Sequence, residues 1–250
     1  MSEHVVVERS GPVQVIRMNR PEKKNALTRA MYQVMSQALT DGDADPAVRV
    51  HVFFGVPGAF SAGNDLNDFM TIATGGEGGL EVWNFLAALA TSQKPVVSGV
   101  DGIAVGIGTT LNLHCDLTFA TPRTVFRTPF VDLGLVPEAG SSLLAPAVLG
   151  RQQAFALLGL GEGFSAERAK EAGLIYAVVA ESELEQAVME AANTIAAKPP
   201  EALKIARDLM LGSRETLKAR IREEGEHFQE RLKSDEARAA LVAFMSRKKG

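Results

Sequence analysis

The sequence is poor in the residues that make covalent cross-links and metal centres. Its single cysteine, Cys115, excludes an intramolecular disulfide and is typical of a protein from a reducing compartment. The four histidines are scattered along the chain, and none has the paired spacing of a metal-binding motif. We therefore expect neither a disulfide framework nor a bound metal.

Long apolar runs and a strong charge of one sign are also lacking. The longest apolar stretches, residues 82–90 and 95–113, are too short or too interrupted to span a bilayer, so no membrane partner is expected. The N-terminal segment has a run of only three valines, far short of the apolar core of a signal peptide. A net charge of −4 gives no footprint for nucleic acid, but it allows an anionic small ligand to be held by local basic side chains.

The chain does have the size and the pattern of an α/β enzyme. Its 250 residues are enough for one large domain, or for a medium-sized domain with an appendage. Strand and helix patterns alternate up to about residue 180, whereas residues 199–245 are almost continuously helical in pattern. The sequence therefore predicts an α/β domain followed by a helical region.

Individual elements can be placed from their periodicity and their caps. Residues 5–8 and 13–18 flank a Ser-Gly-Pro turn and predict a hairpin, and Thr28 predicts the start of an amphipathic helix. Ser165 and Gly173 predict the two ends of a helix over residues 166–172. Further strands are expected at residues 48–54, 95–100, 116–120, 124–127 and 175–180, further helices at 80–90 and 106–115, and a glycine-rich mobile loop at 71–79.

Two glycine-containing segments do not match the known binding and catalytic motifs that they resemble. Residues 102–108 have glycines at the wrong spacing for a dinucleotide-binding G-x-G-x-x-G, and no acidic residue follows about twenty positions on. Residues 58–63 contain one residue too many for the G-x-S-x-G nucleophile elbow, so Ser61 is interpreted as a turn residue. His114 lies on an apolar helix face and is interpreted as a core side chain.

Two other segments carry candidate site residues. Residues 59–69 place small residues directly after a strand, so that main-chain N–H groups could point into a cleft as an oxyanion site requires. An ordinary strand–turn–helix junction with Asp65 as the cap fits the same pattern. Glu138, between a proline and a small-residue helix start, is either a site carboxylate or a first-turn glutamate that complements the helix dipole.

Taken together, these segments resemble the crotonase (enoyl-CoA hydratase/isomerase) superfamily. Residues 19–27 (NRPEKKNAL) resemble its N-terminal signature, and residues 60–66 (FSAGNDL) resemble its coenzyme A and oxyanion-hole segment. Residues 96–116 resemble its second oxyanion segment and the helix that follows. The similarity covers essentially the whole chain. It implies a crotonase/ClpP-like spiral of repeated ββα units over residues 1–195 and a helical trimerisation region over residues 196–250, with trimers often paired into hexamers.

The resemblance also implies where an acyl-CoA substrate binds. The main-chain N–H groups of Asn64 and Ile107 would hold the thioester oxygen; many relatives have glycine where Ile107 stands, which affects geometry and not the donor itself. Arg20 and Lys23 are further candidate partners for the phosphates. The residues implied for substrate and coenzyme A binding are Lys24, Ala26, Ala62, Gly63, Asn64, Asp65, Leu66 and Phe130. No cofactor is implied, because coenzyme A is part of the substrate.

The positions at which the chain has or lacks a glutamate suggest which reaction it catalyses. Hydratases of this superfamily use two glutamates, and the matching positions carry Thr110 and Phe130, neither of which can transfer a proton from carbon. Residues 135–142 (LVPEAGSS) instead resemble the segment of peroxisomal-type Δ3,Δ2-enoyl-CoA isomerases that holds the catalytic glutamate, here Glu138. One carboxylate suffices for this isomerisation, since it can take a proton from C2 and return it at C4 while the N–H groups stabilise the dienolate oxygen.

Other interpretations remain open on the sequence alone. The same fold could serve an enoyl-CoA hydratase, an acyl-CoA hydrolase or a dehalogenase, or a non-catalytic scaffold that binds acyl-CoA or protein. The pKa of Glu138 is also open, since apolar neighbours including Phe130 would raise it and a helix N-terminus would lower it. The final Arg-Lys-Lys-Gly is not the peroxisomal S-K-L signal, so a cytoplasmic location is expected.

Overall fold

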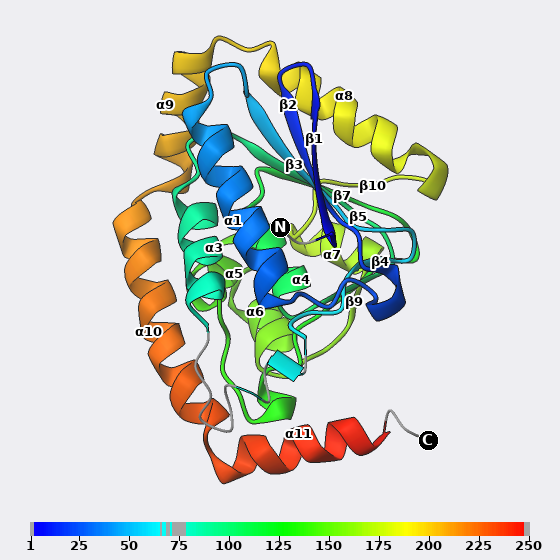
Figure 1. The fold of residues 1–250 in the computed structure, drawn as a ribbon, viewed down its shortest axis with the longest axis vertical. Coiled ribbons are helices and arrows are strands. Elements are labelled where there is room, and N and C mark those ends of the chain that lie inside the picture. Colours follow the sequence, from blue (N-terminus) through cyan, green and yellow to red (C-terminus); the bar gives the residue numbers. More distant parts are fainter. Residues whose placement is uncertain (1–2, 66, 69–70, 72–78, 248–250) are drawn as a thin grey trace.

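The strands form two sheets (Figure 1). The computed structural model describes residues 3–65, 67–68, 71 and 79–247, with side chains described as far as residue 243. The six-stranded sheet has the order β1 (Val5–Ser10), β2 (Val13–Met18), β3 (Val50–Phe54), β5 (Val96–Val100), β7 (Leu117–Ala120), β10 (Ala177–Val178). The four-stranded sheet has the order β4 (Ala59–Ser61), β6 (Ile103–Val105), β8 (Val125–Arg127), β9 (Phe164–Ser165).

Most neighbouring strands of the larger sheet are parallel. Among the strand pairs of this sheet in the described part of the chain, only β1–β2 is antiparallel, as the predicted hairpin requires, with Ser10 opposite Val13 across the Gly11 turn. The pairs β2–β3, β3–β5, β5–β7 and β7–β10 are all parallel. Strand β3 is covered on both faces, so every one of its residues is buried. Its mainly apolar sequence is typical of a parallel strand in this position.

The parallel strands are connected by a repeated ββα unit. Strand β3 leads to β4 and then to α3 (Leu80–Thr91), and β5 leads to β6 and α4 (Ile107–Thr110). Strand β7 leads to β8 and, after a turn region, to α5 (Ser141–Leu149). In each unit the first strand joins the larger sheet and the second joins the smaller one. The predicted spiral of ββα units is therefore confirmed.

The helix caps agree with the sequence. Helix α1 (Arg29–Ala44) begins after Thr28, whose hydroxyl oxygen accepts the Met31 N–H. Helix α7 (Ala166–Ala172) is capped by Ser165 and ends at Gly173 in the left-handed conformation. The helix expected at residues 106–115 is shorter, because α4 continues as a 3-10 helix, η2 (Leu111–His114). The other elements of this part are α6 (Arg151–Leu158), α8 (Leu184–Ala196), η1 (Pro21–Lys23), η3 (Val131–Leu133) and η4 (Glu181–Glu183).

The C-terminal region is helical, but in three separate pieces. These are α9 (Pro200–Leu211), α10 (Arg214–Leu232) and α11 (Asp235–Arg247). Figure 1 shows α10 running down the side of the molecule next to α3, and α11 crossing its lower end. None of the helices in the described part of the chain combines the length and the apolar character that a bilayer crossing requires.

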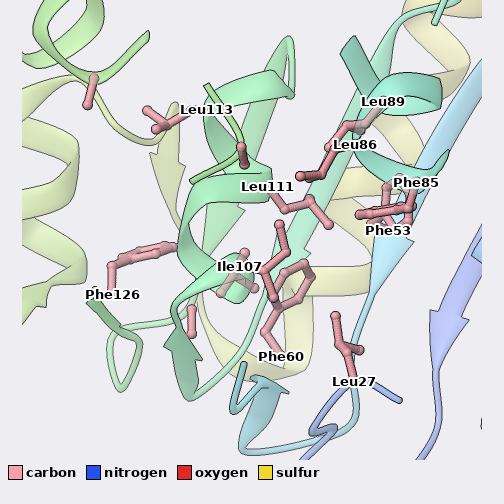
Figure 2. Close-up of a cluster of buried hydrophobic side chains, with 14 of the residues drawn as sticks. Leu27, Phe53, Phe60, Phe85, Leu86, Leu89, Ile107, Leu111, Leu113 and Phe126 are labelled. Carbon is pink, nitrogen blue, oxygen red and sulfur yellow. The ribbon is translucent and has the colours of Figure 1, made fainter. Parts of the chain in front are cut away.

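Two apolar clusters hold the elements together. One packs strands of both sheets against α1, α3 and α4, and Figure 2 shows Phe60, Leu111 and Ile107 within it. The other lies on the opposite face of the larger sheet, where Val52 and Phe54 pack against Val188 of α8. Because Ile107 is almost completely buried, the main chain at the start of α4 is held in a fixed position.

Candidate active site

Asn25 fixes the loop that borders the candidate substrate groove. Its side chain is completely buried, and its backbone adopts a left-handed conformation (φ 53°) that Asn tolerates better than most residues. Oδ1 of Asn25 accepts the N–H of Arg20 at 2.7 Å. Nδ2 donates to the carbonyls of Met18, Ala59 and Phe60. One amide side chain thus joins the loop to the ends of strands β2 and β4.

Ser61 completes this junction as a turn residue, as expected from the sequence. Its hydroxyl donates to the Asn25 carbonyl at 2.8 Å and accepts the Gly63 N–H at 3.1 Å. The side chain is fully buried. Because its hydrogen bonds are satisfied within the turn, Ser61 is not presented to a substrate.

The main-chain N–H of Asn64 points away from the adjacent chain segment. Leu27 donates to the Gly63 carbonyl at 2.8 Å and accepts the Asp65 N–H at 2.9 Å, so it bonds to both neighbours of Asn64. In an extended chain successive N–H groups alternate in direction, which turns the Asn64 N–H to the opposite side. No hydrogen-bond partner for it occurs among the described residues. The Asn64 side chain is held by Tyr32, whose hydroxyl donates to Oδ1 at 2.5 Å.

The second expected donor, the N–H of Ile107, is at the first position of α4. The Gly106 carbonyl accepts the N–H groups of Thr109 and Thr110, at 2.8 and 3.0 Å. The earlier N–H groups of a helix have no carbonyl partner within it, and Ile107 has none in the described part of the chain. Gly106 has φ 57° and ψ −121°, a conformation open to glycine but costly for other residues.

A strained turn presents Glu138. Ala139 and Gly140 both have left-handed backbones, with φ 61° and 71°, and the turn closes by a 3.1 Å bond from the Ser141 N–H to the Glu138 carbonyl. This conformation costs an alanine roughly 1–2 kcal/mol, so the surroundings must hold it. His114 Nε2 lies 2.7 Å from the Ala139 carbonyl. Burial lowers the pKa of His114 to about 4, so the ring is neutral and its Nε2 proton donates to this carbonyl.

The Glu138 carboxyl is buried, with 7% of the residue exposed. Burial raises its pKa to about 8; a 2.6 Å hydrogen bond from the Thr110 hydroxyl opposes the shift, and the nearby charge of Glu224 adds to it. The raised pKa agrees with the desolvation anticipated from the sequence, and the effect that opposes it here is the Thr110 hydrogen bond.

Glu224, from α10, clamps the Glu138 turn from the opposite side. Its two carboxyl oxygens accept the N–H groups of Gly140 at 2.5 Å and of Ser142 at 2.9 Å. These are N–H groups at the start of α5 that would otherwise lack partners. Burial raises the pKa of Glu224, although these hydrogen bonds oppose the shift. Sequence reasoning missed this residue, because nothing local marks a contact across 84 positions.

Two hollows share Asn64 as a lining residue. An apolar cavity of about 80 Å³ lies between α1, α3 and α10, and Glu138 lines it together with Tyr32 and Trp83. A larger groove of about 470 Å³ passes over the loop after β1–β2 and the start of α4. Asn64 and Phe228 line both hollows.

The groove gathers most of the residues expected to bind coenzyme A. Its lining includes Lys23, Lys24, Ala26, Ala62, Gly63, Asn64, Asp65 and Phe130. Leu66 lies outside the described residues. Ile107 lines neither hollow, although Gly106 before it lines the groove. Phe130 lines the groove, as expected of a substrate-binding residue, and is not part of the described lining of the Glu138 cavity. The apolar lining of that cavity comes from Leu27 and from side chains of α1, α3 and α10.

The basic side chains of the loop differ in how they are used. Arg20 donates to Asp65 at 2.6 Å and to the Ala26 carbonyl at 2.8 Å, so its guanidinium is engaged inside the loop. Burial alone would raise the pKa of Asp65, but the hydrogen bond from Arg20 brings it below its ordinary value. Lys23 and Lys24 are exposed at the groove and have no ion pair among the described residues.

Comparison with known proteins identifies the family. The model of the enoyl-CoA hydratase/isomerase family matches residues 8–250. The chain belongs to this family. Enoyl-CoA delta isomerase 2 of Rattus norvegicus is 36% identical over 99% of the chain, which spans 64% of the length of that relative. A Rhizobium meliloti protein named "Probable enoyl-CoA hydratase" is 31% identical, over 99% of this chain and 96% of its own length.

A solved structure shows the same fold. The enoyl-CoA hydratase/isomerase of Pseudoalteromonas atlantica superposes with a TM-score of 0.93 at 34% identity, covering 98% of each chain. The spiral of ββα units is thus the fold of the crotonase family, and the resemblance found in the sequence is confirmed. Relatives named as isomerases and as hydratases both occur in this family, so the family alone does not define the reaction.

Proposed function

We propose that the protein is a Δ3,Δ2-enoyl-CoA isomerase in which Glu138 transfers the proton. One observation carries the proposal: a buried carboxyl group with a pKa of about 8 lines an apolar cavity that also borders Asn64, whose main-chain N–H is unpaired among the described residues. The similarity to enoyl-CoA delta isomerase 2 supports the same reaction. This isomerisation requires a base that lies close to a hydrogen-bond donor for the thioester oxygen.

The two hollows suggest how the substrate lies. We place the thioester carbonyl at the N–H groups of Asn64 and Ile107, the acyl chain in the cavity, and coenzyme A in the groove beside Lys23 and Lys24. A donor aimed at an oxygen on which charge develops stabilises the transition state by on the order of 3–4 kcal/mol. The two main-chain N–H groups supply this stabilisation without any ionisable group.

The proton steps balance with a single carboxyl group. Ionised Glu138 removes a proton from C2 of a 3-enoyl thioester, and the electron pair delocalises through C2 onto the thioester oxygen. Glu138, now protonated, returns the proton at C4, which leaves the double bond between C2 and C3. Apolar side chains around Glu138 keep water away from the dienolate, and the raised pKa makes the carboxylate a stronger base.

The other carboxyl that the described residues place at this cavity bonds to the start of a helix. Asp68 accepts the N–H of Arg29 at the start of α1, at 3.0 Å. Hydration would require a second carboxyl beside the base to activate water. At the two positions where hydratase relatives carry glutamate, Thr110 donates a hydrogen bond to Glu138 and Phe130 lines the groove. These contacts favour isomerisation over hydration.

Product analysis separates the proposal from its alternatives. We expect trans-3-enoyl-CoA to be converted to trans-2-enoyl-CoA. No 3-hydroxyacyl-CoA should form when either of these two thioesters is supplied as the substrate. A 3-hydroxyacyl product would show a hydratase, and release of free coenzyme A would show a hydrolase. Tight binding of acyl-CoA with no turnover would support the non-catalytic scaffold.

We extend the proposal to the setting in which the enzyme works. No cofactor is needed beyond the coenzyme A of the substrate, and the cytoplasm is the proposed location. The helical region over residues 196–250 is proposed to assemble the chain into trimers or paired trimers. Sedimentation equilibrium measures this directly, and a monomer at micromolar concentration would contradict the proposed assembly.

A further inference from the structure

Trp83 lies directly on the backbone of α10. A Cβ atom placed on Gly225 would lie 1.9 Å from Cη2 and 2.6 Å from Cζ3 of the indole. These separations are far below van der Waals contact, so the indole occupies space that any side chain at Gly225 would need. Gly225 lies within a helix and does not have a positive φ, so its backbone conformation does not require glycine. Glycine is needed at this position because a side chain would clash with the indole.

The same indole forms a wall of the cavity that contains Glu138. Trp83 and Leu86 line it from α3, while Phe228 and Leu232 line it from α10. The cavity is small, at about 80 Å³, so its walls limit the acyl chain that it can hold. A shift of the Trp83 ring therefore changes the space available to an acyl chain.

We propose that the contact between Trp83 and Gly225 sets the length of the acyl chain that the enzyme accepts. This inference rests on the placement of the acyl chain in the cavity given under the proposed function. It assigns the substrates to straight-chain acyl-CoA thioesters with an upper length limit set at the Trp83 wall of the cavity. Beyond the limit, each added methylene is expected to lower the affinity about tenfold, because it must displace packed side chains.

The test compares chain-length profiles in a double-mutant cycle. Dissociation constants for saturated acyl-CoA esters with four to sixteen carbons are measured by calorimetry on the wild type, Trp83→Ala, Gly225→Ala and the double variant. We call the longest acyl chain that is still bound tightly the chain-length limit. In Trp83→Ala, which removes the wall, this limit should move to longer chains. We expect it to move to shorter chains in Gly225→Ala, because the new methyl group pushes the indole into the cavity.

The cycle identifies the contact itself. In the Trp83→Ala background the Gly225→Ala substitution should leave the profile unchanged, since the methyl group then enters vacated space. Asn84→Ala, on the exposed side of α3, is the matched control and should match the wild type. Trp83→Phe provides a smaller change if Trp83→Ala does not fold, and it should move the limit less far in the same direction.

Two results would overturn the inference: an unchanged limit in Trp83→Ala or Trp83→Phe, or an equal effect of Gly225→Ala in both backgrounds. Saturated esters cannot be isomerised, so this test does not depend on turnover. A shifted profile in a protein that fails to isomerise 3-enoyl-CoA would leave the chain-length inference standing and overturn the proposed reaction.

Discussion

The Thr110 hydroxyl donates a 2.6 Å hydrogen bond to Oε1 of Glu138. Thr110 is the last residue of the short helix α4, and Ile107, whose main-chain N–H is the proposed donor to the thioester oxygen, is the first. One helical turn therefore links the base to a proposed oxyanion donor. Because the Ile107 side chain is locked in the core, the two groups keep a fixed separation.

Replacing Thr110 with valine should shift the pH dependence of the reaction. The hydrogen bond stabilises the ionised carboxylate, so its loss should raise the pKa of Glu138 further. A hydrogen bond to a charged group is worth about 1.5–3 kcal/mol, which corresponds to an alkaline shift of about one to two pH units. Thr110→Ser keeps the donor and is the control. An identical pH profile of kcat/KM in the valine variant would contradict this role.

The wild-type pH profile should reflect a base that must lose its proton. The pKa of Glu138 is raised to about 8, so the ionised form is a minority at pH 7. We expect kcat/KM for 3-enoyl-CoA to rise about tenfold per pH unit below pH 8 and to level off above it. Measured rates that stay constant between pH 6 and 9 would show that Glu138 does not act as the base.

The same pKa predicts an effect on stability. Between the ordinary glutamate pKa and about 8, the folded protein holds a proton on Glu138 that the unfolded chain releases. Wild-type stability should therefore decrease as pH rises through this window, by up to about 1.4 kcal/mol per unit. Glu138→Gln cannot ionise and should become more stable than the wild type as the pH rises. Denaturant unfolding at pH 5, 7 and 9 measures the difference, and a pH-independent difference would refute it.

Glu224 should influence the reaction from outside the cavity lining. Glu224→Gln removes a charge that raises the pKa of Glu138, so the pH profile should move toward acid. The amide can accept only one of the two N–H groups well, and each buried N–H left without a partner costs about 1–3 kcal/mol. We expect a lower kcat with little change in KM, as the turn loosens.

The neighbouring Glu223 provides a matched control for this experiment. It lies on the same helix, and its carboxyl is exposed and paired with Arg220. Glu223→Gln should leave kcat and the pH profile unchanged. If both substitutions had the same effect, the clamp on the Glu138 turn would not be the cause.

Local signals in the sequence were sufficient for many of the elements and singled out Glu138 as the proposed base. Caps at Thr28 and Ser165 mark helix starts because side-chain oxygens bond N–H groups only a few residues away. Part of the groove lining could also be predicted from the sequence, because it is built from consecutive residues such as Ala62, Gly63 and Asn64. Contacts of short sequence separation are encoded in short patterns.

The supporting contacts could not be predicted, because they join distant segments. Glu224 reaches the Glu138 turn, and Trp83 reaches Gly225, only after α10 has packed on α3 and α5. Phe130 lines the groove, in keeping with its expected role in substrate binding. Its position relative to the Glu138 cavity depends on the packing of η3 against α11, which no local pattern marks.

The most direct test of the account is the kinetics of Glu138→Gln with trans-3-enoyl-CoA, measured together with acyl-CoA affinity. Glutamine keeps the size of the side chain and can still accept the Thr110 hydrogen bond, but it cannot take a proton from C2. The account predicts a loss of kcat of roughly 10²–10⁴-fold, the contribution of a general base, with the dissociation constant of acyl-CoA near that of the wild type. Isomerisation at the wild-type rate in Glu138→Gln would contradict it.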